Sequence, residues 1–427
     1  MNQNSFLLQQ VRVIDSVTSR DFVADVLVVD GSIAQITTEK QDYDSDVQVM
    51  AGDRLILGSG LVDLYSHSGE PGHESRETLL SLAQSAKAGG FTQVGVLPDT
   101  NPVIDNRETL SAIATKYTQL KQTQLKQSNS GLPELNFWAN LAIKDTSSMG
   151  ELGELSDLAF GFSQHLDFSQ LVFFKQVLEY LHPLGKAIAI DLSQNQLANN
   201  GIVRESKESI AYGVPSNPAY SETAAIAAIL EIVADLQTPV HLMRVSTARG
   251  VELIAEAKQR GVPVTASTTW MHLLFDTTDQ ASYDSNLRLE PPLGTPLDRK
   301  ALQQGVKQGT VDAIAIDHQA YTYEEKTVPF ALAPPGVIGL QLALPILWQK
   351  LVTTNILTPL ELWQALSSRP LDCLGEQPIE ITVGTSIAAL TLFDPDQIWQ
   401  VNHQTMHSLS ANTPWWYQEI TGKVICV

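Results

Sequence analysis

A histidine that could bind a metal ion follows a short apolar run, residues 56–64. The run contains two glycines and leads into polar residues, which is typical of a buried barrel strand whose end carries chemistry. Residues i and i+2 of a strand share a face, so two histidines at that spacing can bind one metal ion. Here only His67 has the required side chain, because Tyr65 stands two residues earlier.

Two carboxylates stand at the ends of later apolar runs. Asp191 ends the run 187–191, and Asp317 follows the run 312–316. In a closed barrel the carboxyl ends of the strands meet on one face, so His67 and both carboxylates could lie together there. One histidine and two carboxylates are enough to bind a single divalent ion that keeps open coordination positions.

The elements that would position these residues alternate along the middle of the chain. Apolar runs typical of strands are separated by amphipathic stretches typical of helices. The predicted strands are 59–64, 92–97, 136–142, 158–162, 186–191, 239–244, 263–267 and 312–316, and the clearest helices are 74–88, 170–184, 221–236 and 246–260. Eight alternating strands predict an α/β protein with a closed (β/α)8 barrel, which we assign to residues 58–377. The polar stretch 120–131 predicts a surface loop.

Both ends of the chain predict a second domain. Residues 1–57 alternate apolar and polar positions around the turn Asp30-Gly31, which indicates antiparallel strands. The segment 378–427 has the same character, with predicted strands at 379–383, 388–393 and 421–425. We therefore predict one small discontinuous β domain built from residues 1–57 and 378–427.

The run 60–72 resembles the signature of the dihydroorotases, members of the amidohydrolase superfamily, whose pattern is Gly-Leu-x-Asp-x-His-x-His-x-Arg-Glu-Pro-Gly. Further similar segments follow in the family's order at 89–92, 98–105, 245–247, 261–266, 291–293, 311–318 and 324–326. The resemblance covers nearly the whole chain and implies the same barrel and terminal β domain. It also implies a metal site at the strand ends, where an aspartate after strand eight serves as general base for a metal-bound water.

Most of the ligand positions implied by the resemblance have changed in this chain. The altered positions are Tyr65 for the first histidine, Gln164 for an acidic residue or carboxylated lysine, and Asp191 and Arg244 for the histidines after strands five and six. His67 and Asp317 keep the expected types. We expect Asp317, which holds the catalytic position, to be vestigial.

Arg244 is the decisive change. A guanidinium is not deprotonated in proteins and has no lone pair to give to a metal ion. We therefore expect no metal or other cofactor, and we expect Arg244 to pair with Asp191, Asp317 or both. The residual candidates for a single metal ion are His67, Asp191 and Asp317, and zinc would be expected only if such a site works.

The implied substrate contacts have changed as well. Gly69 stands at the position of the arginine that holds the substrate carboxylate, and Asp99 stands at the position of an asparagine. A lost charge-assisted hydrogen bond removes about 1.5–3 kcal/mol, and a carboxylate at Asp99 would repel an anion. Tyr321 replaces a further expected substrate contact.

We expect the remaining histidines of interest and Asp63 to have no part in chemistry. His241 lies among apolar strand residues, which predicts a hydrogen-bonded core histidine, and Asp63 precedes the ligand positions, which predicts a structural role. The histidines in predicted loops and polar helix faces, expected to be solvated, are His73, His165 and His182.

Composition limits the class of protein. The 427 residues carry a formal net charge of -20, which argues against nucleic acid or an anionic membrane as the main partner. The two cysteines, Cys373 and Cys426, form no ligand or disulfide pattern. Because we also find no signal peptide and no long apolar segment, we expect a cytoplasmic protein.

We predict a dihydroorotase-like protein of pyrimidine biosynthesis that has lost its metal centre. Some inactive members of this family assemble with aspartate transcarbamoylase, so the resemblance implies an oligomer in which this chain is a noncatalytic partner. The aromatic run 413–417 could cap the β domain or form a contact patch. Two alternatives stay open: an active dihydroorotase with a rearranged single-metal site that interconverts N-carbamoyl-aspartate and dihydroorotate, and a sensor that binds a pyrimidine intermediate without converting it.

Overall fold

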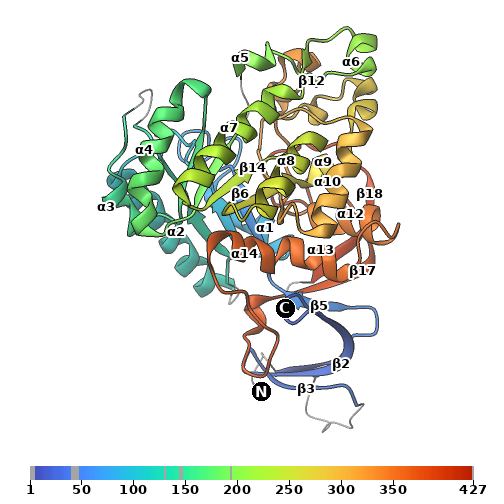
Figure 1. Cartoon of the computed structure of the whole chain (residues 1–427). Coiled ribbons are helices and arrows are strands. Elements are labelled where there is room, and N and C mark those ends of the chain that lie inside the picture. Colours follow the sequence, from blue (N-terminus) through green and yellow to red (C-terminus); the bar gives the residue numbers. More distant parts are fainter. Residues whose placement is uncertain (1–4, 40–47, 129–130, 144–147, 193–194, 426–427) are drawn as a thin grey trace.

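The structure is a computed structural model that describes residues 5–39, 48–128, 131–143, 148–192 and 195–425. Figure 1 shows a large helical and β body above a small sheet, and both chain ends lie near that sheet. The cysteine at position 426 and two residues of the predicted loop 120–131 lie outside the described ranges.

Parallel strands form the barrel expected from the sequence. In order around the barrel they are β6 (Leu61–Ser66), β7 (Phe91–Val96), β8 (Glu134–Phe137) with β9 (Ala139–Asn140), β10 (Phe162–His165), β11 (Ile188–Asp191), β14 (Val240–Met243), β15 (Val264–Thr269) and β16 (Ala313–Ala315). Backbone hydrogen bonds from Asp317 to Tyr65 (3.1 Å) and from His67 to His318 (2.8 Å) join the last strand to the first. The prediction of a (β/α)8 barrel is therefore confirmed.

Helices cover the outside of the strands, as Figure 1 shows. The longer ones are α1 (Leu79–Ala88), α2 (Arg107–Ser128), α4 (Leu171–Leu181), α7 (Tyr220–Leu236), α8 (Ala248–Gln259), α10 (Pro296–Gln308), α13 (Pro359–Leu366) and α14 (Ser368–Leu374). In α8 the Thr247 side chain accepts a hydrogen bond from the Gly250 backbone (3.0 Å), which caps the helix start. One face of α8 then buries Val251, Ile254 and Ala257 against the strands.

Shorter elements lie between these strands and helices. They are α3 (Leu152–Ser156), η1 (Phe168–Gln170), η2 (His182–Leu184), α5 (Asn195–Ala198), β12 (Val203–Arg204), α6 (Lys207–Tyr212), β13 (Ser216–Asn217), α9 (Trp270–Leu274), η3 (Thr277–Ser282), η4 (Ser285–Leu287), α11 (Tyr323–Lys326), η5 (Phe330–Leu332), α12 (Ala343–Leu347), the π-helix η6 (Trp348–Val352) and η7 (Ile387–Ala389). The segment after β11 contains α5, β12, α6 and β13, and Figure 1 places α5, β12 and α6 at the end remote from the small sheet.

The predicted surface loop at 120–131 is wrong over most of its length. The helix α2 continues to Ser128, and Gly131 follows two residues that lie outside the described ranges. Lysine, glutamine and leucine are good helix formers, so their polarity marks an exposed helix face and not a break in the helix. The buried residues Leu110, Ile113 and Tyr117 hold the first half of the same helix to the barrel.

The small sheet joins both ends of the chain. Its strands run in the order β18 (Glu419–Ile425), β17 (Leu390–Gln400), β5 (Ile56–Ser59), β1 (Phe6–Asp15), β2 (Arg20–Val29) and β3 (Ser32–Thr37), and β4 (Gln48–Ala51) pairs with β1. A β domain from both termini is thus confirmed, while the boundaries at 57 and 378 stay predictions. The predicted strand 379–383 is wrong: the segment has no strand pairing and meets the sheet through the Ser59 hydroxyl, which donates to the Ile379 carbonyl at 3.1 Å, and through buried Ile381.

The aromatic run near the C-terminus packs against the barrel. Trp415 stacks on Trp270 of α9 with ring centroids 5.1 Å apart, and it also contacts Phe275 at 5.5 Å. Trp415 therefore anchors the loop between β17 and β18 on the barrel, while the two predicted roles of the run, capping the β domain or forming a contact patch, stay predictions. Tyr417 remains largely exposed.

Candidate functional site

The strand ends bring together the residues that the sequence singled out. His67 follows β6, Asp191 ends β11, Arg244 follows β14 and Asp317 follows β16. Because these strands are parallel neighbours or near neighbours in a closed barrel, their ends open on one face. The four side chains meet there, and we call them the Arg244 cluster.

Arg244 occupies the centre of this cluster. Its Nε and Nη2 donate to the two oxygens of Asp317 at 2.8 and 2.6 Å, and its Nη1 donates to Asp191 at 2.7 Å. The two-bond contact with Asp317 matches the planar fork of a guanidinium. The side chain is 9% exposed, so these ion pairs are shielded from water. The predicted pairing of Arg244 with both carboxylates is confirmed.

Tyr65 fixes the backbone of both partners. Arg244 and Asp317 have φ angles of 54° and 52°, in the left-handed region that residues other than glycine rarely adopt. The Tyr65 hydroxyl accepts a hydrogen bond from the Arg244 backbone at 3.0 Å, and the Tyr65 carbonyl accepts one from the Asp317 backbone at 3.1 Å. The residue at the lost ligand position therefore holds the ion pair in place.

A buried chain of hydroxyl and imidazole groups supports Tyr65 from below. Its hydroxyl lies 2.9 Å from the Ser267 Oγ, which in turn lies 2.8 Å from the His241 Nε2. The His241 Nδ1 contacts the Thr265 Oγ1 at 2.9 Å. Burial lowers the pKa of His241 to about 3 and raises the pKa of the Tyr65 phenol, so both are neutral. The predicted hydrogen-bonded core histidine is confirmed.

His67 is held between two carboxylates at the edge of the cluster. Its Nδ1 donates to Asp99 at 2.6 Å, and its Nε2 lies 3.1 Å from Arg244 Nη2 and 3.3 Å from Asp317 Oδ1. Burial alone would lower the pKa of His67, but the charges of Asp99 and Asp317 outweigh it and raise the pKa to about 9. Burial would likewise raise the pKa of Asp317, and the charge of Arg244 instead lowers it well below its usual range.

Two residues of β10 border the cluster. The buried Oε1 atom of Gln164 has no hydrogen-bond partner in the described part of the chain. The His165 Nδ1 lies 3.8 Å from an Asp191 oxygen, and this carboxylate raises the pKa of His165 against the effect of burial. His165 is exposed, as expected, but it ends the strand β10 and does not lie in a loop. His73 and His182 are exposed, as expected, although the His182 Nδ1 also contacts Thr238 at 3.0 Å.

At the three positions where the expected substrate contacts have changed, neighbouring groups of the protein occupy the space or the hydrogen-bonding atoms. A Cβ atom at Gly69 would lie 2.4 Å from the Glu77 carbonyl oxygen and 2.5 Å from that of His73, so no side chain fits without moving the backbone. The Asp99 carboxylate accepts a hydrogen bond from His67. The Tyr321 ring, 8% exposed, lies under the Arg76 guanidinium at 4.9 Å and near the Lys326 ammonium at 5.5 Å.

The residues of the cluster do not fit a divalent cation. The carboxylate oxygens that a metal ion would need accept hydrogen bonds from Arg244, which offers donors and no lone pair. A cation beside the guanidinium would also meet a fixed positive charge. Within the described ranges, no three or more His, Cys, Asp or Glu side chains are arranged to hold a metal ion.

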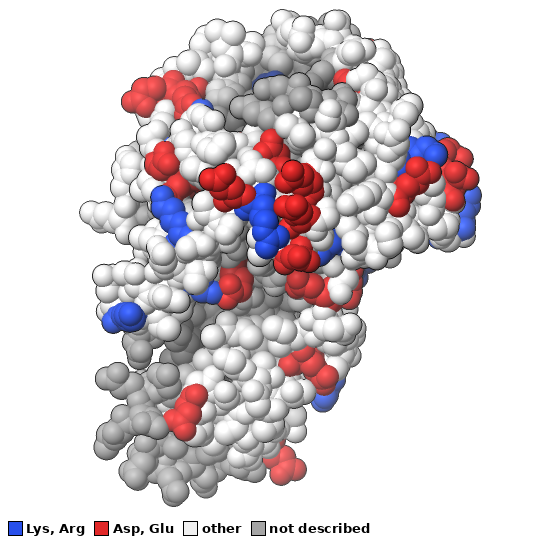
Figure 2. All heavy atoms as spheres, turned by 90° about the vertical axis from the view of Figure 1, so that its left-hand side faces the viewer, with Lys and Arg blue, Asp and Glu red and all other residues white. Residues whose placement is uncertain are grey.

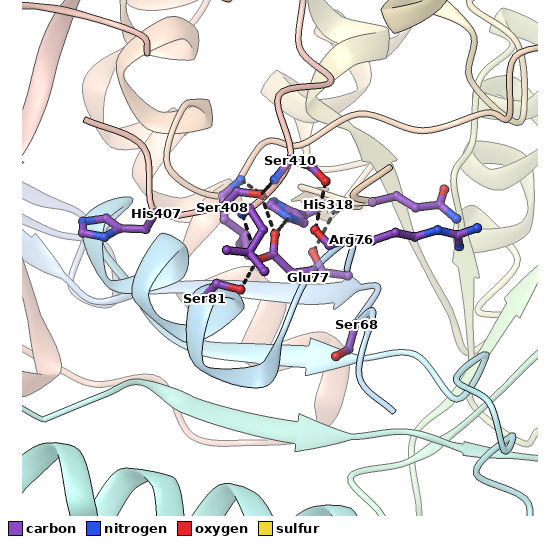
Figure 3. A network of polar contacts seen from close by, with 12 residues as sticks. Ser68, Arg76, Glu77, Ser81, His318, His407, Ser408 and Ser410 are labelled. Atoms are coloured by element: carbon purple, nitrogen blue, oxygen red, sulfur yellow. Dashed lines mark hydrogen bonds and ion pairs between the residues drawn. The ribbon is translucent and has the colours of Figure 1, made fainter. Parts of the chain in front are cut away.

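A second buried polar network surrounds Glu77 and His318, the residue that follows Asp317 (Figure 3). The fully buried Glu77, just before α1, accepts hydrogen bonds from His318 Nε2 at 3.1 Å, from Ser81 and from Ser408 at 2.5 Å. The His318 Nδ1 accepts from the backbone of Gly339 at 3.2 Å. This network ties the loop between β17 and β18 to the residue that follows Asp317.

Sequence reasoning missed three of these contacts. It treated Asp99 only as a lost substrate position, it assigned no role to Glu77, and it considered Tyr65 only as a lost ligand. The end positions of the first two strands could have predicted the contact between His67 and Asp99, because those strands are neighbours in a barrel. Asp63 was assigned correctly: it is buried and accepts the Ile316 backbone at 2.8 Å and the Ser66 hydroxyl at 2.5 Å.

Comparison with known proteins identifies the family. The chain is 39% identical over 437 aligned positions to a probable dihydroorotase-like protein of Synechocystis sp., with 97% of this chain and 98% of the relative covered. It is 31% identical over 430 positions to the dihydroorotase of Pelotomaculum thermopropionicum, with 98% of each chain covered. The chain belongs to the dihydroorotase family. A comparison with protein-family models finds no match.

Solved structures agree with this fold for the dihydroorotase-like chain. The L-hydantoinase (dihydropyrimidinase) of Arthrobacter aurescens superposes with a TM-score of 0.82 at 20% identity, covering 99% of this chain and 94% of that one. The dihydropyrimidinase of Brevibacillus agri gives 0.78 at 19% identity, covering 99% and 93%. At this identity the likeness supports the barrel and the terminal β domain alone.

The surface of this family member is acidic. Figure 2 shows one face, on which Asp and Glu side chains gather around a few Lys and Arg side chains near the middle. The excess of acidic over basic side chains on this face agrees with the formal net charge of -20. None of the helices in the described ranges has the length and apolar character needed to cross a bilayer.

Proposed function

We propose that this chain is a noncatalytic, dihydroorotase-like protein of pyrimidine biosynthesis, in which Arg244 takes over the structural role of a metal ion. The observation that carries this proposal is the set of three short hydrogen bonds from one guanidinium to Asp317 and Asp191. Family enzymes need carboxylates with free lone pairs to activate water on a metal ion. In this chain those lone pairs are directed at Arg244.

The space around the cluster supports the same conclusion. Two cavities border it, one of about 20 Å³ beside Asp317 and Glu290 and one of about 10 Å³ beside Asp191 and Arg244. Sites for small molecules usually enclose about 300–1,000 Å³. These cavities hold at most a water molecule, which argues against binding of a pyrimidine intermediate at the Arg244 cluster.

The biological role that we propose is structural support of aspartate transcarbamoylase. This part of the proposal rests on the resemblance to inactive family members that assemble with that enzyme. A noncatalytic chain keeps its barrel only if the fold itself is useful, and a role in an assembly provides such a use.

A single experiment on the purified chain tests the loss of catalysis. Metal content by elemental analysis and turnover of both dihydroorotate and N-carbamoyl-aspartate should stay at background after growth and assay with added zinc. A family dihydroorotase prepared in parallel serves as the positive control. About one metal ion per chain, together with turnover that disappears in an Asp317→Asn variant, would instead establish the single-metal enzyme that His67, Asp191 and Asp317 could form.

The assembly with aspartate transcarbamoylase needs its own measurement. The chain and aspartate transcarbamoylase from the same organism should co-elute in size-exclusion chromatography, with a mass by light scattering equal to a defined complex. Separate elution at tens of micromolar would remove the partner role. Calorimetry with dihydroorotate and N-carbamoyl-aspartate should show no heat of binding, and a saturable signal would favour the sensor.

A further inference from the structure

A cavity of about 410 Å³ lies away from the barrel mouth, between the second half of α2 and the start of β8. The next helix along the chain, α3, has only five residues and ends at Ser156. Residues 158–160, which precede β10, therefore form the opposite wall in place of a helix. Sites for small molecules usually enclose about 300–1,000 Å³, so this cavity is large enough for one.

Aromatic and aliphatic side chains line the inner part of the cavity. The rings of Tyr117 and Phe137 pack edge to face with their centroids 6.5 Å apart. Phe160 is partly exposed, and the rim leucines Leu125 and Leu158 are 52% and 45% exposed. These side chains offer an apolar surface on which a planar ring can stack.

Lysine side chains surround the rim of the cavity. The ammonium groups of Lys87 and Lys186 each donate to a backbone carbonyl of a lining residue, at 2.7 and 3.2 Å. Lys121 lines the cavity itself and pairs with Glu134, whose side chain is 64% exposed. The helix that carries Lys121, residues 107–128, has four basic residues and one acidic residue, although the whole chain carries a formal net charge of -20. The rim therefore favours an anionic group.

Asn136 contributes an amide to the lining. It shares one face of β8 with Glu134, because residues i and i+2 of a strand point to the same side, and the two lie about 7 Å apart along the strand. Within the described ranges the Asn136 amide has no hydrogen-bond partner, so it can donate to and accept from the edge of a heterocyclic ring. The exposed pair of Lys121 and Glu134 contributes little to stability, so an anion of a ligand can replace Glu134 at small cost.

We propose that this cavity binds a nucleoside monophosphate. The base stacks on Phe160 and its edge bonds to Asn136, while the phosphate binds to Lys121. A heterocyclic ring joined to an anion over a short distance satisfies the aromatic wall, the amide and the ammonium group together. This proposal does not depend on whether the barrel is catalytic, because the cavity shares no residue with the Arg244 cluster.

Isothermal titration calorimetry of the full-length chain tests this site. UMP or AMP should bind at one molecule per chain with a Kd below about 1 mM. The matching nucleoside and inorganic phosphate should each bind at least about tenfold more weakly, because each offers only part of the ligand. Lys121→Gln should raise the Kd of the nucleotide about tenfold and leave that of the nucleoside unchanged, because only the nucleotide carries the phosphate.

Two further variants separate the cavity from its surroundings. Lys126→Gln is the matched control, because Lys126 is exposed on the same helix and does not line the cavity, so the Kd should stay within about twofold. Leu158→Trp should fill the cavity and abolish binding with an unchanged circular dichroism spectrum, because the rim position is exposed.

The proposal would be overturned if neither UMP nor AMP bound at about 5 mM. It would also be overturned by nucleosides that bind as tightly as their monophosphates, by a Kd that neither Lys121→Gln nor Leu158→Trp changes, or by equal losses in the Lys121 and Lys126 variants.

Discussion

At the scale of single residues, one side chain decides the chemistry of the barrel mouth. Arg244 lies 53 residues from Asp191 and 73 residues from Asp317 in sequence, yet it bonds to both. The arrangement is a buried ion-pair network in which the cation belongs to the polypeptide. Its stability therefore depends on keeping all three members.

Arg244→Met should destabilise the protein strongly. The substitution keeps much of the side-chain volume but leaves two shielded carboxylates without their cation, which costs about 3–5 kcal/mol in comparable networks. Urea unfolding followed by circular dichroism measures the loss. Arg249→Met is the control, because Arg249 is about half exposed and pairs with exposed Glu252 and Glu256; it should change the unfolding free energy far less. Equal effects of the two substitutions would show that the cluster contributes nothing special.

The protonation of His67 should make stability depend on pH. Its pKa of about 9 in the folded chain exceeds the value of about 6.5 expected in the unfolded chain, so the folded state binds the proton more tightly. The resulting stabilisation is fully present below about pH 6.5 and is lost as pH rises through about 9, and it amounts to roughly 3 kcal/mol.

Unfolding free energies at several pH values between 6 and 10 measure this loss, and His67→Gln should flatten the curve over that range. NMR titration of the His67 ring gives the pKa directly. A midpoint at or below 6.5 would show that Arg244 opposes protonation more strongly than the two carboxylates favour it.

At the scale of elements, the loop between β17 and β18 links the small sheet to the barrel mouth. Ser408 reaches the buried Glu77 carboxylate, and Asn412 donates to the carbonyl of Gln319 at 2.9 Å (Figure 3 shows the Glu77 contacts). The same loop buries Trp415 on α9. A segment far along the chain thus braces His318, through Glu77, and Gln319, the two residues that follow Asp317.

Ser408→Ala should loosen this brace. Removing one donor from a buried carboxylate costs about 1–2 kcal/mol and should speed amide hydrogen exchange across 401–418. Thr123→Ala is a suitable control, because the exposed Thr123 hydroxyl donates to the Gln119 carbonyl within the same helix, α2. Unchanged exchange in the Ser408 variant would mean that the other contacts of the loop, among them those of Asn412 and Trp415, fix it without Ser408.

Element boundaries also show where sequence reasoning succeeds. The strands were predicted within a few residues because each is a short apolar run, and burial of such runs is a local property. The helix α2 was cut short because its second half is polar, and polarity alone does not distinguish an exposed helix from a loop. The segment 379–383 has the alternation of a strand but finds no continuous pairing partner, which only the sheet topology reveals.

At the scale of the whole molecule, the barrel carries its central cation within the chain. Exhaustive dialysis against EDTA should therefore leave the melting temperature unchanged within about 1 °C, because no bound ligand is lost from the folded state. A family dihydroorotase treated in the same way is the comparison. A marked fall in the melting temperature that zinc restores would show that a metal ion stabilises this chain after all.

The sequence by itself determined the family, the barrel, the terminal β domain and the loss of metal-ligating side chains, because residue types and hydrophobic periodicity are local quantities. Only the tertiary structure decided what the altered residues do. Tyr65 holds Arg244 and Asp317, Asp99 pairs with His67, and Glu77 braces the C-terminal loop. Each of these contacts joins residues from different strands or loops, and such distances depend on how the closed barrel brings its strand ends together.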